Sequence, residues 1–153
     1  MVSTNSEELT PRIGDDQIMI DVMIRITVLW IFLAVANTAH YVMYVCFEPG
    51  AIQKMACMHT SEERAKNARL AIGEAFTSWL IPLTMAFLTV TLGDSVNRSL
   101  NMVLGGFYTV YGIIHIAKCP VVHLTKKPSV HQVLLSISAI VVAALIFGYA
   151  WSW

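Results

Sequence analysis

Charged residues are scarce in this chain of 153 residues. Asp, Glu, Lys and Arg make up 13% of the sequence, with ten acidic against ten basic side chains and a formal net charge of zero. A nucleic-acid-binding surface needs an excess of clustered Lys and Arg, so we expect no nucleic-acid partner. Soluble domains average about 25% charged residues, and the composition therefore disfavours that class.

Cysteine pairs and catalytic motifs are lacking as well. Cys46, Cys57 and Cys119 form no CxxC pair, which excludes the motif of small membrane thiol oxidoreductases. The sequence shows no Ser-His-Asp arrangement, phosphate-binding Gly-rich loop or nucleotide motif, so we do not favour an enzyme. Residues 1–19 are polar and acidic, without the basic start and short apolar run of a secretory signal. We therefore expect the first apolar segment to stay in the mature protein.

Long apolar runs fill most of the chain instead. The sequence is 56% hydrophobic with a mean hydropathy of +0.63. Because a membrane-spanning helix needs about 20 mostly apolar residues, four segments qualify. They predict an all-α, four-helix transmembrane bundle of antiparallel up-down topology, with the lipid bilayer as its surroundings. A polar tail, 1–19, precedes a single transmembrane domain, 20–153, with spans at about 20–46, 70–92, 99–118 and 130–153.

Basic residues argue for an orientation, since positively charged loops stay cytoplasmic. Three basic residues, Arg12, Arg25 and Arg98, lie at the face that holds both termini, which this count places outside. The first and third loops and their borders hold the others: Lys54, Arg64, Lys66, Arg69, Lys118, Lys126 and Lys127.

Small residues in the third and fourth segments permit close approach of helix backbones. They serve either packing within the bundle or a face for dimerisation. Binding of a partner predicts that Gly105, Gly106, Ala143 and Ala144 face outwards. The full set is Gly105, Gly106, Thr109, Gly112, Ala139, Ala143, Ala144 and Gly148.

Each predicted span carries one ionisable group near the same membrane face. At 1.5 Å per residue, His40 lies about 9 Å below that face, Glu74 about 6 Å, His115 about 5 Å and His131 about 2 Å. Further polar side chains share their helical stripes. Because polar stripes face a bundle interior, we predict a ligand or proton site formed by Asn37, His40, Tyr44, Glu74, Tyr108, Tyr111 and His115.

Three chemistries fit this layer. His40, Glu74, His115 and His131 have the donor atoms for zinc, copper or iron. Two histidines on facing helices would alternatively ligate a haem iron axially. Glu74 with the histidines would otherwise relay a proton or bind a cationic or polar ligand. The plain alternative is a set of hydrated polar groups near the lipid headgroups, with no ligand at all.

Two smaller features belong beside this layer. Cys57, His59, Cys119 and His123 are a weaker candidate set for copper or zinc. Asp21 and Arg25 are four residues apart, and we predict an ion pair on the helix surface. The alternative is contact of Arg25 and Arg98 with an anionic headgroup or substrate. The Asn97-Arg98 pair in a short turn is also placed to cap a helix end.

Short fragments spread from about residue 20 to the C-terminus carry a resemblance. They are Ile20-x-Val22-x-Ile24, Leu29-Trp30, Pro49-Gly50-x-Ile52-x-x-Met55, Ile81-Pro82, Val96-Asn97-Arg98-x-x-Asn101, Leu104-Gly105 with Tyr108-Thr109, and Tyr149-Ala150-Trp151-x-Trp153. Together they resemble a family of small four-span prokaryotic membrane proteins, catalogued as domain of unknown function 6326.

The resemblance implies the four-helix membrane fold, a multi-pass location in a prokaryotic plasma membrane, and structural roles for Pro82, Asn97, Arg98 and Tyr108. It implies no activity. The family pattern lacks the histidine and cysteine features described above, so it supports no metal site. It also places both termini inside, the reverse of the basic-residue count, and the orientation stays open.

We predict a non-enzymatic membrane protein that binds a small ligand or serves as an accessory subunit, in a homo-oligomer or a larger membrane complex. A metal- or haem-binding redox component is the first alternative, and it requires at least three of His40, Glu74, His115 and His131 to converge. A small oligomeric transporter is the second, and it requires a water-filled cavity that reaches Glu74.

Overall fold

A computed structural model describes residues 13–47, 62, 69, 72, 73, 75–124 and 130–153, and this part of the chain is all-helical. The elements in order are α1 (Ile13–Phe47), the π-helical turn η1 (Phe76–Leu80), α4 (Ile81–Thr91), α5 (Asp94–Leu124) and α6 (Val130–Ser152). The all-α class predicted from the apolar segments is confirmed for these residues.

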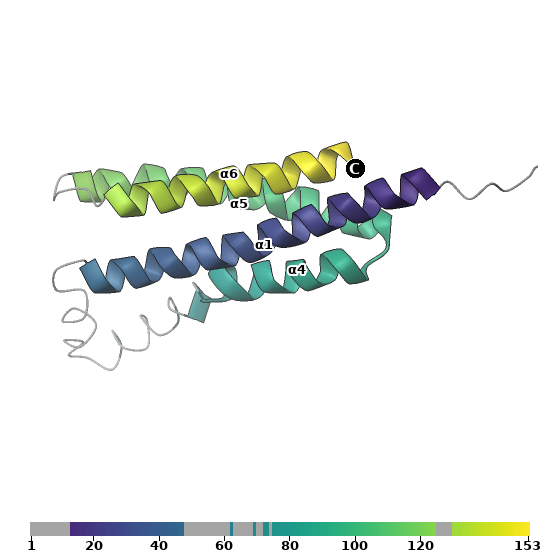
Figure 1. Cartoon of the computed structure of the whole chain (residues 1–153). Coiled ribbons are helices and arrows are strands. Elements are labelled where there is room, and N and C mark those ends of the chain that lie inside the picture. Colours follow the sequence, from purple (N-terminus) through teal and green to yellow (C-terminus); the bar gives the residue numbers. More distant parts are fainter. Residues whose placement is uncertain (1–12, 48–61, 63–68, 70–71, 74, 125–129) are drawn as a thin grey trace, which may run out of the picture.

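The helices lie side by side along one direction (Figure 1). α1 packs along α6 and along α4, and α5 packs along α6. The start of α1, the turn from α4 to α5 and the end of α6 lie at one end of the bundle, and the end of α1 lies at the other. Long side chains of α1 and α5 meet across the centre, where Trp30 contacts Tyr108 and His40 contacts His115.

α1 begins earlier than the sequence predicted. The polar tail was expected to run to residue 19, but the helix starts at Ile13. With 35 residues at 1.5 Å each, α1 is about 50 Å long, more than the roughly 30 Å hydrocarbon core of a bilayer.

α5 is also longer than the predicted segment 99–118. It begins at Asp94, so only Leu92 and Gly93 separate it from α4, and it continues through Pro120 to Leu124. The expected helix stop at Cys119-Pro120 was wrong, because a proline inside a helix removes one backbone bond without forcing the chain to end there. His115, Cys119 and His123 therefore lie on one continuous helix.

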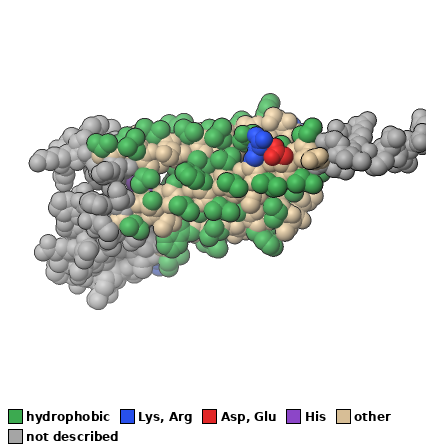
Figure 2. Space-filling view, in the orientation of Figure 1, with side chains coloured by type: hydrophobic (Ala, Val, Ile, Leu, Met, Phe, Trp, Pro, Cys, Tyr) green, Lys and Arg blue, Asp and Glu red, His purple; other side chains and the backbone are tan. Residues whose placement is uncertain are grey.

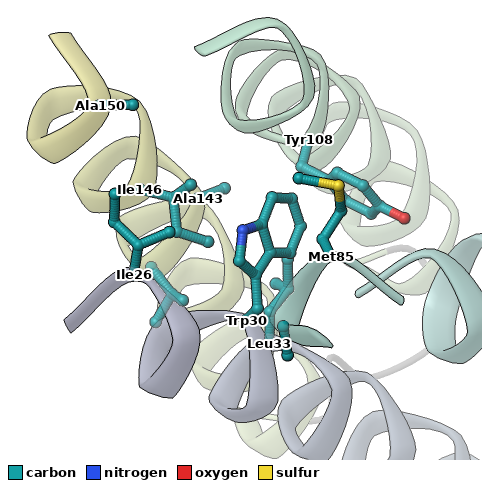
Figure 3. Close-up of a cluster of buried hydrophobic side chains, with 10 residues drawn as sticks. Ile26, Trp30, Leu33, Met85, Tyr108, Ala143, Ile146 and Ala150 are labelled. Carbon is teal, nitrogen blue, oxygen red and sulfur yellow. The ribbon is translucent and has the colours of Figure 1, made fainter. Parts of the chain in front are cut away.

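The core lies between the four helices in the half of the bundle that holds the α4–α5 turn. Figure 3 shows the Trp30 indole in its middle, with Ile146 and Ala143 of α6 on one side and Tyr108 and Met85 on the other. Trp30 is completely buried, and its ring meets the Tyr108 ring edge-on at 5.7 Å between centroids. This large side chain of α1 thus lies in a buried cluster that includes residues of α4, α5 and α6.

Close backbone approach joins α5 to α6. A Cβ atom added at Gly105 would lie 2.9 Å from the Phe147 backbone nitrogen and 3.2 Å from the Phe147 Cα. Of the four residues expected to face outwards, Gly105 and Ala143 are buried between the helices, Gly106 is half-buried and Ala144 is exposed. The expectation that all four small residues face an outside partner was therefore wrong for Gly105 and Ala143, whose small size serves packing within the bundle.

The outer surface is apolar. Figure 2 shows hydrophobic side chains over most of the visible face and a small patch of charged side chains toward the end where α1 begins. Three helical stretches are long and apolar enough to cross a membrane: Gln17–His40, Asp94–Ala117 and Val133–Ser152. The apolar stretch Phe76–Thr91 is shorter, and residues 72, 73 and 75 before it are helical.

Gly105→Ala tests the close contact between α5 and α6. We expect the free energy of unfolding in detergent to fall by about 1–3 kcal/mol, because the added methyl group meets backbone atoms that cannot rotate away. Gly148→Ala is the matched control on the same helix pair: its Cβ meets no atom within 4 Å. Helix propensity alone would make that control neutral or more stable. Equal destabilisation by both variants would contradict the packing argument.

Candidate functional site

A chain of side-chain hydrogen bonds crosses the buried half of the bundle. Trp30 Nε1 of α1 donates to Asn101 Oδ1 of α5 at 2.6 Å. Asn101 Nδ2 donates to Asn97 Oδ1 at 2.7 Å and to the Asn97 carbonyl oxygen at 2.9 Å. Asn97 Nδ2 in turn donates to the Thr89 carbonyl oxygen of α4 at 2.6 Å. The bonds therefore link α1, α5 and α4 at one level.

The direction of this chain follows from the chemistry of its first member. An indole N–H donates only, so the atom of Asn101 that faces Trp30 must be the oxygen. The Asn101 amino group then faces Asn97 and requires an acceptor there, which turns the Asn97 amino group toward Thr89. The Thr89 hydroxyl lies 2.7 Å from the Met85 carbonyl oxygen and 3.3 Å from Asn101 Oδ1, and its single proton goes to the nearer acceptor.

Asn97 and Arg98, near the start of α5, supply hydrogen bonds to the C-terminal ends of α4 and α6. The Thr89 carbonyl is among the last four of α4, which have no partner within that helix, and Asn97 supplies one. Arg98 Nη2 donates to the Trp151 carbonyl oxygen at 3.1 Å, which places a positive charge at the C-terminal end of α6. Asn97 and Arg98 were expected in the short turn but lie within α5, and from there their side chains reach carbonyls at the ends of α4 and α6.

Trp30→Phe tests the chain of hydrogen bonds. The variant keeps an aromatic ring in the core but removes the donor to Asn101, so we expect the free energy of unfolding to fall by about 1–3 kcal/mol. Trp151→Phe is the control for the substitution itself, because Trp151 is 63% exposed, and we expect it to change stability little. A thermal or denaturant titration in detergent measures both. A neutral Trp30→Phe would mean that the Asn101 oxygen is satisfied without the indole.

The helix that contains α4 is interrupted at Pro82. A proline has no N–H, and its ring collides with the carbonyl four residues earlier, here Ser78. The chain responds by widening into η1, where the Ile81 N–H donates to the Phe76 carbonyl five residues back. Continuing that pattern by one residue would pair Pro82 with the Thr77 carbonyl, but Pro82 has no proton to give.

Two neighbouring helices supply the missing donors. Asn37 Nδ2 of α1 donates to the Ser78 carbonyl oxygen at 3.3 Å, and the Tyr108 hydroxyl of α5 donates to the Thr77 carbonyl oxygen. Both carbonyls that face the proline therefore receive a proton from another helix. An unpaired carbonyl that is partly buried costs free energy, and these two side chains supply the missing donors. Pro82 and Tyr108, for which separate structural roles were expected, thus act at the same place: the proline leaves a carbonyl without its backbone donor, and the tyrosine supplies one.

A double-mutant cycle tests this account of the break. In Pro82→Ala, the alanine amide N–H can donate to a carbonyl of the preceding turn. It then replaces the hydrogen bond that the Tyr108 hydroxyl otherwise supplies. Tyr108→Phe should then cost less stability in the Pro82→Ala background than in the natural one, by on the order of 1 kcal/mol. Unfolding in detergent measures all four proteins. Strict additivity would show that the tyrosine hydroxyl does not compensate for the proline.

The histidines of α1 and α5 meet near the other end of the bundle. The His40 and His115 rings lie edge to face, 5.5 Å apart between centroids and 75° between planes. The Tyr111 ring lies 6.2 Å from the His115 ring, one turn earlier on α5. His40 follows Asn37 by one turn of α1, so the paired rings lie beside the interruption at Pro82. The predicted layer thus brings two of its histidines into contact.

Other predicted site residues lie outside the described part of the structure. These are Glu74, Cys57 and His59, together with the side chains of Tyr44, Cys119, His123 and His131. Among the residues that are described, no group of three or more histidine, cysteine or acidic side chains is placed to hold a metal ion. A haem held axially by His40 and His115 would have to lie between two rings that already touch.

Asp21 and Arg25 form the ion pair predicted from their spacing, with Arg25 Nη2 2.7 Å from Asp21 Oδ2. Both side chains are more than half exposed, so the pair contributes little to stability. The Arg25 guanidinium also lies over the Tyr149 ring of α6, 5.8 Å from its centroid. The pair offsets the charge of Arg25 on the apolar outer surface.

Comparison with known proteins adds no assignment. No protein-family model matches the chain, and the curated proteins and the solved structures include no significantly similar one.

Proposed function

We propose that this chain is an integral membrane protein whose four helices cross the bilayer in antiparallel up-down order. Support comes from three helices of sufficient length and apolar character, and from an outer surface rich in exposed Ile, Leu, Val and Phe. The interior hydrogen bonds also support the proposal, because a bilayer core offers no water to an unpaired backbone group. The proposal includes a multi-pass location in a prokaryotic plasma membrane, which is what the family resemblance implies.

Its proposed role is non-enzymatic: it binds a small polar or cationic ligand at the layer of His40 and His115. The observation that carries this role is the contact between these two rings, which brings together two titratable groups from different helices. Ionisable side chains are rare within membrane-spanning helices and usually mark a ligand or ion site. The Tyr111 ring beside His115 adds a hydroxyl group to the same layer.

The accessory-subunit role has less support. Gly105 and Ala143, which were expected to form the docking face, are buried inside the bundle. The redox alternative gains one observation, since His40 and His115 converge as a metal site would require. Glu74 and His131 would have to complete such a site. A transporter would need a water-filled path to Glu74.

Native mass spectrometry with elemental analysis and an optical spectrum tests the proposed role. We expect detergent-purified protein to carry a small organic or cationic adduct that is lost in His115→Ala. Ser99→Ala is the control, because the Ser99 hydroxyl donates to the Ser95 carbonyl within its own helix and is exposed at the other end of the bundle. Stoichiometric metal or a haem absorption band, lost in His115→Ala, would favour the redox role instead. If the natural protein and both variants all carry no adduct, metal or haem, the ligand site is contradicted.

A further inference from the structure

The two halves of the interrupted helix are held by different forces. α4 buries Pro82, Met85, Ala86 and Thr89 against its neighbours, whereas η1 contributes no buried residue. Phe76, Trp79 and Leu80 of η1 are each exposed to 43% or more. Apolar burial therefore fixes α4 but hardly fixes η1.

Side-chain hydrogen bonds hold η1 instead. Asn37 binds the Ser78 carbonyl from α1, and Tyr108 binds the Thr77 carbonyl from α5. Pro82 removes the backbone bond that would otherwise continue the helix across the junction. Segments held by few buried contacts open at a small fraction of the free energy of global unfolding. η1 has these properties, and α4 does not.

We propose that η1 is a hinged strap: Pro82 is the hinge, and the Asn37 and Tyr108 bonds are the two latches that hold the strap closed. When both latches release, η1 moves away from α1 and α5 while α4 stays in place. The far end of α4 remains fixed because Asn97 caps the Thr89 carbonyl in the core. Opening uncovers α1 at Asn37, one turn before His40, and so exposes the side of the histidine pair.

This hinge is independent of the proposed ligand, since it follows from the backbone interruption and its two donors. It gives the histidine layer a lateral entrance, on the side of η1, that needs no change in the rest of the bundle. π-helical turns are frequent at functional sites, and sharp bends of helices occur at prolines and π-helical turns. Transporters likewise use interrupted helices at their binding sites.

Distances between paired spin labels in lipid nanodiscs test the hinge. The full chain carries labels at Phe76→Cys on η1 and Val110→Cys on α5, both exposed positions, with Cys46, Cys57 and Cys119 replaced by serine. The reference pair, Val90→Cys and Val103→Cys, lies on α4 and α5 beyond the hinge. Motion of η1 alone changes the first distance and leaves the second unchanged.

Tyr108→Phe removes one latch and keeps the aromatic ring. We expect a second, longer population to appear between labels 76 and 110, with the reference distance unchanged. Asn37→Leu removes the other latch and should give the same result. Thr109→Val is the control, because the Thr109 hydroxyl donates to the Gly105 carbonyl within its own helix and is not one of the two bonds to η1. Adding Pro82→Ala to Tyr108→Phe should abolish the second population, since the restored N–H closes the junction.

An unchanged distribution in either latch variant that folds would overturn the hinge, and so would equal broadening of both label pairs. If one latch variant does not fold, the other decides the question. Persistence of the second population in Pro82→Ala with Tyr108→Phe would also overturn it. Ligand binding is measured separately by mass spectrometry, so failure of the hinge and failure of the ligand site are distinguishable.

Discussion

The side-chain amide of Asn101 joins three helices, and the rest of the arrangement depends on that junction. Its oxygen receives the Trp30 proton from α1, and its nitrogen donates to Asn97, which caps α4. Buried amides are tolerated only when each polar atom has a partner, so the junction fixes how far each helix can slide along its neighbours. The apolar core around Trp30 then packs against helices whose relative height is set. Without the junction, packing of similar apolar side chains would allow several heights.

Pro82 also connects helices, because the carbonyls that it leaves without a backbone donor are bound by side chains of two other helices. In water, the carbonyls freed by Pro82 would bind solvent, and α4 would need no help from Asn37 or Tyr108. Within a low-dielectric bundle the same carbonyls require protein donors. The interruption thus becomes a point of contact among α1, α4 and α5. It also divides the bundle into a half fixed by burial and a half held by hydrogen bonds.

The sequence predicted the helices well and their polar contacts less well. Apolar length indicated the helices, and the spacing of Asp21 and Arg25 indicated their ion pair. The dipeptide at 97–98 indicated a cap because both side chains suit helix ends. The role of Trp30 was not foreseen, because an apolar helix gives no sign of which face its tryptophan turns inward. Asn97 and Asn101, four apart on one helical stripe, were the signal that would have pointed to a buried polar contact. The early start of α1 and the passage of α5 through Pro120 were missed because hydropathy measures apolar length and does not mark where a helix begins or ends.

The directional order of the Trp30, Asn101 and Asn97 bonds has a consequence for how this protein changes over evolutionary time. Each link uses a donor on one residue and an acceptor on the next, so no member can reverse its role alone. Replacing any one leaves a buried amide or carbonyl without its partner, and a simultaneous change of its neighbours is needed to remove that cost. The three positions are therefore expected to vary together among related sequences, because a change at one of them restores stability only when its neighbour changes to match.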